Sequence, residues 1–107
     1  MVEHVVALIT APSKEVGRDV GRALLEQGLA ACVNLVPAIE SLYAWEGELC
    51  NDEEVLLVIK TTAAVLRELM RTVQDIHPYD VPEIIALPIA AGSPDYLNWI
   101  SDVVDDE

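Results

Sequence analysis

Three short runs of apolar residues most strongly limit how this 107-residue chain can fold. They span residues 5–9, 55–59 and 84–89, and the last two are apolar at every position. A strand with one solvated face alternates apolar and polar residues, so uninterrupted runs indicate strands that are covered on both faces. The sequence therefore predicts a sheet with two buried faces.

Two segments between these runs have the spacing of amphipathic helices. The first follows Ser13, a favourable N-cap, and ends at Gly28, a favourable C-terminal cap. Gly17 and Gly21 lie inside it and would allow close packing on a neighbouring element. The second spans about residues 62–76 and places on one face Leu66, Leu69, Met70, Val73 and Ile76.

A long hairpin is predicted between the two helices. One strand covers residues 29–45, with a break or bulge at Pro37, and the other returns from residue 49 to 61. Tyr43 and Trp45 fall on the same face of the first strand. The turn at residues 46–48 sets a register in which Cys50 faces roughly Ala44 and Cys32 faces roughly Thr62. The two thiols are then too far apart for a disulfide within the chain.

The end of the chain adds a strand over residues 83–90 and a final helix that begins at Ser93-Pro94-Asp95. Residues 105–107 form an acidic end that we expect to be frayed. The complete order is β-α-β-β-α-β plus a helix, in one domain of residues 1–107. It predicts the α+β class and a ferredoxin-like sandwich with a long hairpin arm.

This architecture has a consequence for assembly. Two helices cover only one face of a four-stranded sheet, and the final helix is too short to cover the other. The apolar runs therefore predict that the second face is buried against further copies of the chain. The hairpin arm with Tyr43 and Trp45 would be the exchanged edge.

The net charge of −13 arises from 19 acidic residues and 6 lysines and arginines. Such a field repels phosphate backbones and anionic membranes and attracts cations, so neither nucleic acid nor membrane is expected as a partner. Residues 1–4 contain no basic region, and the following apolar run is too short for a signal peptide or a membrane span. We expect the protein to reside in the cytoplasm.

Residues 77–83 carry the densest group of reactive side chains, on a stretch that Pro78 and Pro82 keep extended. His77 is the best candidate metal ligand, although a histidine at a helix C-terminus can equally be held there by the helix dipole. Glu83 can neutralise a cation or pair with a neighbouring subunit. Tyr79 fits a packing or interface role better than a catalytic one.

Cys32 has two interpretations. Its small, apolar neighbours favour a buried and inert thiol, but a thiolate is also a soft ligand that suits copper. Cys50, next to the turn, is expected to be exposed. The sequence contains no nucleophile–base pair, Gly-rich phosphate loop, His-Glu-x-x-His motif or paired-cysteine cage, and it predicts no enzyme.

The chain resembles the CutA family, the divalent-cation tolerance proteins, over nearly its whole length. The resemblance rests on five blocks: Leu29-Ala30-Ala31-Cys32-Val33-Asn34, Tyr43-Ala44-Trp45-Glu46-Gly47, Glu54-Val55-Leu56-Leu57-Val58-Ile59-Lys60-Thr61, His77-Pro78-Tyr79-Asp80-Val81-Pro82-Glu83 and Tyr96-Leu97-Asn98-Trp99-Ile100. Asp80 departs slightly from the family pattern, in which Glu is common. The resemblance implies a ferredoxin-like subunit in a homotrimer, with strands that pair between subunits. It also implies a link to copper and other divalent cations and an architecture similar to the PII signal-transduction proteins.

The leading hypothesis is a cytoplasmic homotrimer that binds Cu²⁺ or another divalent cation loosely. The predicted metal ligands are Cys32, His77 and Glu83, followed by Asp80 and Glu46. The alternative is a trimeric signalling or binding module for a small ligand or a protein partner.

Overall fold

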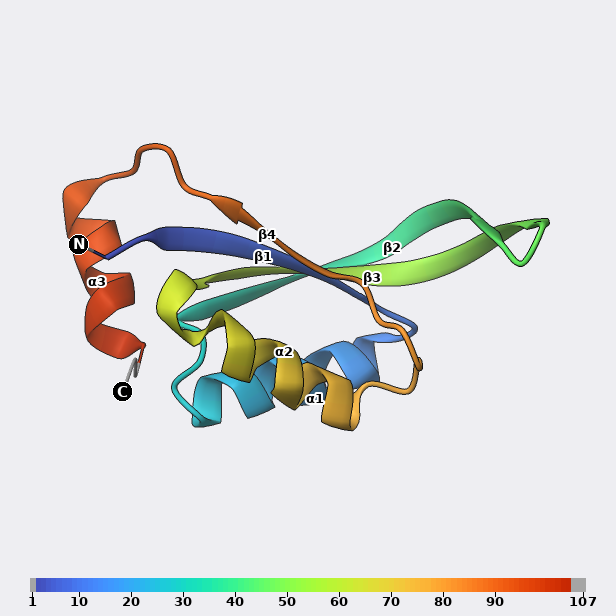
Figure 1. Cartoon of the computed structure of the whole chain (residues 1–107), viewed down its shortest axis with the longest axis horizontal. Coiled ribbons are helices and arrows are strands. Elements are labelled where there is room, and N and C mark those ends of the chain that lie inside the picture. The colour runs from blue at the N-terminus through green and yellow to red at the C-terminus, as the bar shows by residue number, and fades with distance from the viewer. Residues whose placement is uncertain (1, 105–107) are drawn as a thin grey trace.

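The computed structural model of the protein describes residues 2–104. Its elements are β1 (His4–Ala11), α1 (Lys14–Glu26), β2 (Cys32–Trp45), β3 (Glu48–Thr62), a 3₁₀ turn (Ala63–Val65), α2 (Leu66–Ile76), β4 (Ile84–Pro88) and α3 (Pro94–Val103) (Figure 1). This order confirms the predicted α+β fold. The predicted acidic end at residues 105–107 lies outside the described residues.

The four strands form one antiparallel sheet in the order β2-β3-β1-β4. At its centre, Ile9 of β1 lies opposite Leu57 of β3 on one side and Ile84 of β4 on the other. Helices α1 and α2 lie side by side against one face of the sheet, and α3 packs at the end where β1 begins (Figure 1). The arrangement is the ferredoxin-like sandwich that the element order predicted.

The hydrophobic core lies between the sheet and the two helices. Strand residues at odd positions point into it, as Ile9 and Leu57 do, because side chains alternate along a strand. Val20 and Leu24 of α1 and Leu69 of α2 pack in the same core cluster as these strand residues. Each such side chain contributes about 1.5–3 kcal/mol by leaving water, so this layer supplies most of the driving force for folding.

The glycines of α1 lie where the helix approaches the sheet most closely. A Cβ atom on Gly17 would lie 3.2 Å from Leu35 Cδ2, and one on Gly21 would lie 3.2 Å from Val33 Cγ1. Both distances are tighter than ordinary van der Waals contact. The predicted close packing at these glycines is confirmed.

The predicted start of β2 at residue 29 was wrong, and the end of α1 explains why. The N–H of Leu29 donates to the Leu24 carbonyl at 2.8 Å and the N–H of Gly28 donates to the Leu25 carbonyl at 3.2 Å, while Gly28 has φ +70°. These two bonds form a Schellman cap, which uses backbone groups that a strand would need. The strand therefore begins at Cys32. Helix α2 and strand β4 also begin later than predicted, at Leu66 and Ile84.

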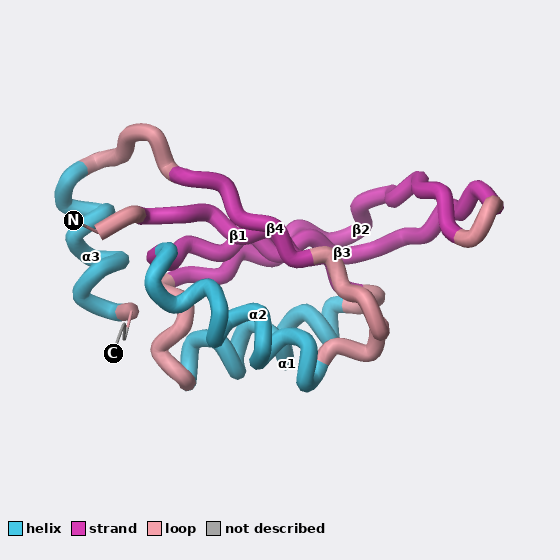
Figure 2. The backbone as a smooth tube through the Cα atoms, in the orientation of Figure 1, coloured by secondary structure: helices cyan, strands magenta, loops and turns pink. Residues whose placement is uncertain are grey.

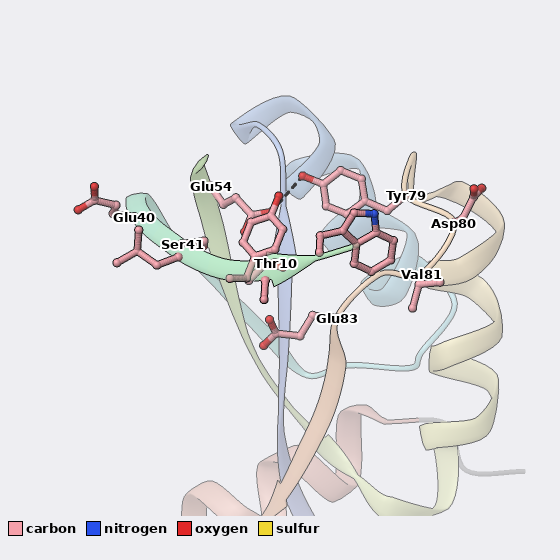
Figure 3. Close-up of a pocket in the computed structure, with 12 residues that line it drawn as sticks. Thr10, Glu40, Ser41, Glu54, Tyr79, Asp80, Val81 and Glu83 are labelled. Atoms are coloured by element: carbon pink, nitrogen blue, oxygen red, sulfur yellow. Dashed lines mark hydrogen bonds between the residues drawn. The ribbon is translucent and has the colours of Figure 1, made fainter. Parts of the chain in front are cut away.

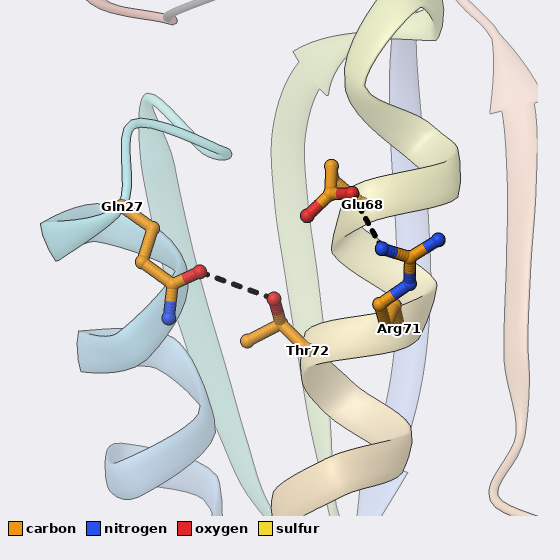
Figure 4. Close-up of polar contacts among 4 residues, drawn as sticks. All are labelled: Gln27, Glu68, Arg71 and Thr72. Carbon is orange, nitrogen blue, oxygen red and sulfur yellow. Dashed lines mark hydrogen bonds and ion pairs between the residues drawn. The ribbon is translucent and has the colours of Figure 1, made fainter.

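Two polar contacts lie on the helix layer (Figure 4). Thr72 Oγ1 of α2 donates to Gln27 Oε1, next to the end of α1, at 3.2 Å and so joins the two helices. Arg71 pairs with Glu68 within α2 at 3.1 Å. The second pair is exposed and adds little, because surface ion pairs contribute roughly 0–1 kcal/mol.

The opposite face of the sheet has no helix over it in the described chain. Side chains on this face include Val36 of β2 and Ile85 and Leu87 of β4, and all three are exposed. Beyond the sheet, β2 and β3 continue as a twisted two-stranded arm that extends well past the helices (Figure 2). Leu49, near the tip of this arm, is 92% exposed. One chain alone thus presents a broad apolar surface.

Candidate functional site

A cavity of about 750 Å³ lies where the arm passes the connector 77–83 (Figure 3). One wall comes from β2 and β3, and the other comes from the connector. The lining residues are Thr10, Glu40, Ser41, Leu42, Tyr43, Ala44, Trp45, Glu54, Tyr79, Asp80, Val81 and Glu83. The volume is typical of a small-molecule pocket.

His77 anchors the start of the connector. It is the C-cap of α2, is only 6% exposed, and hydrogen-bonds through both ring nitrogens. Its Nε2 donates to the carbonyl oxygen of Thr10 at 2.8 Å, since a carbonyl can only accept, and its Nδ1 accepts the N–H of Tyr79 at 3.1 Å. A ligand on either nitrogen would displace one of these bonds. In this arrangement the imidazole is neutral and positions Tyr79.

Tyr79, which His77 positions, lines the cavity. Its hydroxyl donates to Glu54 Oε2 at 3.0 Å, as Figure 3 shows. Glu54 is 8% exposed, and the described residues give it no ion pair. Burial, and then the hydrogen bond to Glu54, raise the pKa of Tyr79 to about 12. The phenol is therefore a fixed hydrogen-bond donor at neutral pH.

This shift gives a testable titration. In the folded protein Tyr79 should ionise near pH 12 rather than at the ordinary tyrosine pKa of 10, as measured by tyrosinate absorbance of wild type minus Tyr79→Phe. Because the folded-state pKa is raised, the contribution of Tyr79 to stability is complete below pH 10 and falls as the pH rises toward 12. In Glu54→Gln the midpoint should move down. A difference curve centred near pH 10 in wild type would contradict the Tyr79–Glu54 contact.

The cavity is strongly acidic. Four carboxylates line it, from Glu40, Glu54, Asp80 and Glu83, and no lining residue is lysine or arginine. The sequence has no lysine or arginine between Arg22 and Lys60 or after Arg71. Lys14 lines a separate pocket together with Glu53 and Glu54. Within the described part of the chain, however, no three His, Cys, Asp or Glu side chains are grouped as a metal site requires.

The structure places the predicted ligands apart within one chain. Glu83 lines the cavity, whereas His77 is not among the lining residues and hydrogen-bonds to the carbonyl oxygen of Thr10. Cys32 pairs with Lys60 on β3, whereas Thr10 pairs with Leu56, four residues earlier on that strand. At about 3.3 Å per strand residue, Cys32 and Thr10, the residue that His77 contacts, are offset by roughly 13 Å along the strands. The three residues do not fit one metal ion in a single chain.

The other candidates have distinct places. Asp80 lines the cavity, whereas Glu46 lies in the turn at the tip of the arm and does not. Cys32 was expected to be buried and Cys50 exposed, but both thiols are half-buried. The predicted partners of the cysteines were also off by one or two residues, because the hairpin pairs Cys50 with Tyr43 and Cys32 with Lys60.

Sequence reasoning overlooked Glu54 as a site residue. It lies directly before the apolar run of β3 and follows Asp52 and Glu53. Its position on the strand was the available signal. Glu54 is two residues from Leu56 and four from Val58, so its side chain lies on the same face of the strand as theirs, which is the sheet face without helices.

The fold and the cavity define a ferredoxin-like α+β domain with an extended hairpin arm and an acidic, aromatic pocket between the arm and the connector. The chain belongs to the CutA family, since residues 5–103 match the family model described as CutA1 divalent ion tolerance protein. The predicted family resemblance is thereby confirmed.

Individual relatives agree with this assignment. The chain is 52% identical over 97 residues to the divalent-cation tolerance protein CutA of Thermus thermophilus, covering 91% of this chain and 94% of that one. A solved structure of the divalent cation tolerance protein from that organism superposes with a TM-score of 0.94 at 49% identity, over 95% of this chain and 99% of that chain. CutA1 from Oryza sativa superposes with a TM-score of 0.96 at 44% identity, over 99% and 97%.

Animal relatives are longer proteins. The chain is 44% identical over 99 residues to the CutA protein of Mus musculus, which covers 92% of this chain but only 56% of the mouse protein. Separately, none of the helices in residues 2–104 combines the length and apolar character needed to span a bilayer.

Proposed function

We propose that the protein acts as a cytoplasmic homotrimer that binds Cu²⁺ or similar divalent cations loosely. The observation that carries this proposal is the match of residues 5–103 to a divalent ion tolerance family. The acidic composition supports it, because a net charge of −13 raises the local concentration of cations.

Assembly into a homotrimer is supported by the uncovered sheet face. Ile85 and Leu87 are exposed on β4, and both β2 and β4 are edge strands in the sheet of one chain. Unpaired strand edges and contiguous apolar surface favour pairing with further copies. The trimeric state itself is what the family resemblance implies.

The proposed copper ligands are Cys32, His77 and Glu83, contributed by more than one chain. The separation of Cys32 from His77 within a chain supports an arrangement across subunits. Thiolate and imidazole favour copper over magnesium or manganese. His77 would have to exchange one of its two hydrogen bonds for the metal, which agrees with loose binding.

Copper titration with paired variants tests these ligands. Cys32→Ser and His77→Ala should each weaken Cu²⁺ binding by roughly tenfold or more, the scale of losing a group from a metal site. Cys50→Ser and His4→Ala are the matched controls, since they remove the other free thiol and the other imidazole, and both should leave the affinity unchanged. Acidification should also weaken binding, because protons compete for the ligands. Calorimetry at physiological salt measures each affinity.

Two results would count against the ligand assignment. Equal affinity in Cys32→Ser and Cys50→Ser would remove Cys32 from the site. Loss of all binding with added salt would reduce copper binding to diffuse attraction, because exposed charges are screened beyond about 8 Å at physiological ionic strength.

The remaining parts of the proposal concern location and chemistry. Both described cysteines are free thiols, which fits the reducing cytoplasm, and cell fractionation tests this. We propose no catalytic role and no nucleic-acid or membrane partner.

A small-ligand binding module is the second candidate, and the cavity of about 750 Å³ favours it.

A further inference from the structure

Lys60 differs in position from every other lysine and arginine of the chain. The other five belong to the helix layer: Lys14, Arg18 and Arg22 on α1, and Arg67 and Arg71 on α2. Lys60 lies on β3, two residues beyond Val58, so its side chain is on the sheet face without helices. A copy that covered this face would therefore meet one basic side chain on it.

The ammonium group of Lys60 has no carboxylate partner among residues 2–104 of its own chain. Its Nζ donates to Asn34 Oδ1, which belongs to a neutral amide, and the one ion pair of these residues joins Arg71 to Glu68. An ammonium group has three donors, so a carboxylate can join the amide at Nζ. Lys60 is already half-buried in a single chain. Covering it further is unfavourable unless the covering copy supplies a negative charge.

Glu54 has the opposite requirement on the same face of the sheet. Its side chain lines the cavity between the arm and the connector, is 8% exposed, and accepts a hydrogen bond from Tyr79 (Figure 3). Lys14 lines a second pocket with Glu54, but the described residues form no ion pair between the two. A buried carboxylate without an opposite charge is unfavourable. Glu54 thus lacks a cation in a single chain.

Lys60 and Glu54 cannot pair within one chain. They lie six residues apart on β3, which at about 3.3 Å per residue separates them by roughly 20 Å. A closed ring of copies removes this obstacle, because each of its contacts joins one surface of a copy to a different surface of the next. We propose that Lys60 of one copy enters the cavity of the next copy and pairs with Glu54. This inference rests on the homotrimer of the proposed function.

The pair makes the cavity a composite site. Four carboxylates line it in a single chain without a lysine or arginine, and the next copy supplies the missing positive charge. One such pair forms at each of the three contacts of the ring. It also selects how the copies meet, because another placement would leave the ammonium and the carboxylate buried and unpaired.

A double-mutant cycle on assembly tests the pair. Lys60→Met removes the charge but keeps a long side chain, and Glu54→Gln removes the charge but keeps an acceptor for Tyr79. Each should weaken association at a contact by roughly tenfold or more, because the other charge is left buried and unpaired. The double variant should assemble no worse than the weaker single variant. Sedimentation equilibrium in graded urea, with a chelator present, measures the equilibrium between single chains and trimer.

Lys14→Met is the matched control. It removes the same charge from the lysine that lines the second pocket with Glu54, and so it tests a counter-charge from within the chain. The variant should assemble like the wild type. Combined with Glu54→Gln, it should add nothing to the loss that Glu54→Gln causes alone.

Each result of the cycle decides the proposal. Unchanged assembly in Lys60→Met, or additive losses from Lys60→Met and Glu54→Gln, would overturn the pair. Coupling of Glu54 to Lys14 in place of Lys60 would overturn it as well. A wild type that sediments as a single chain would remove the proposed homotrimer itself, whereas a trimer without coupling would leave the homotrimer intact and remove only the pair.

Discussion

Leu57→Ala should lower the free energy of unfolding by about 2–5 kcal/mol, the range expected for truncating a fully buried leucine. Leu57 is fully buried on β3, between β1 and β2 and under α1. A Cβ atom on Gly17 of α1 would lie 3.2 Å from Leu35 Cδ2 and 3.7 Å from Val55 Cγ1, and these side chains still separate helix and sheet after Leu57 is truncated. The helix cannot move inward to fill the cavity that alanine leaves. Urea denaturation at a fixed chain concentration measures the loss.

The matched control is the same substitution on the same strand. Leu49→Ala removes an equal volume from β3 at a position that is 92% exposed, and it should change stability by less than about 0.5 kcal/mol. Similar losses at the two positions would show that burial within one chain does not determine stability here. In that case the tip of the arm would be covered by another copy as firmly as Leu57 is covered by α1.

Ile85→Asp should dissociate the proposed homotrimer. Ile85 lies on β4, on the sheet face without helices, and is 51% exposed in the single chain. If further copies cover this face, the aspartate carboxylate would be buried without a partner, at a cost of several kcal/mol. The mass measured by sedimentation equilibrium should then fall from three times the 11.7 kDa chain mass toward the mass of a single chain.

Leu25→Asp is the control for this prediction. Leu25 is 44% exposed, close to the value for Ile85, but it lies on α1 on the opposite side of the molecule. The variant should keep the mass of the wild type. Dissociation in both variants would point to general destabilisation, and dissociation in neither would mean that the β4 face is not the interface.

Much of the fold could be predicted because local patterns specify it. Ser13 caps α1 through its side chain, which accepts the N–H of Val16, and Gly28 ends the helix with the positive φ expected there. The apolar runs at residues 5–9 and 55–59 located two strands of the core, β1 and β3. Errors arose at boundaries such as residue 29, where a cap and a strand compete for the same backbone groups.

The candidate site was only partly predictable. The connector 77–83 was identified as important because its prolines and reactive side chains are adjacent in the chain. Its partners are not adjacent, since Tyr79 meets Glu54 across 25 residues and His77 meets Thr10 across 67. No local pattern indicated that both nitrogens of His77 would be occupied.

The sequence alone determined the family, through the five blocks that resemble it. It also determined the order of helices and strands and the presence of a surplus apolar face, because these follow from periodicity, caps and composition. Only the tertiary structure decided that Cys32 and His77 lie apart within a chain, that Glu54 is buried, and that three aromatic rings share a cavity with four carboxylates. The physical reason is that strand register and the path of the connector are set by the packing of the whole chain. A shift of one residue in register would turn Glu54 to the opposite face of the sheet.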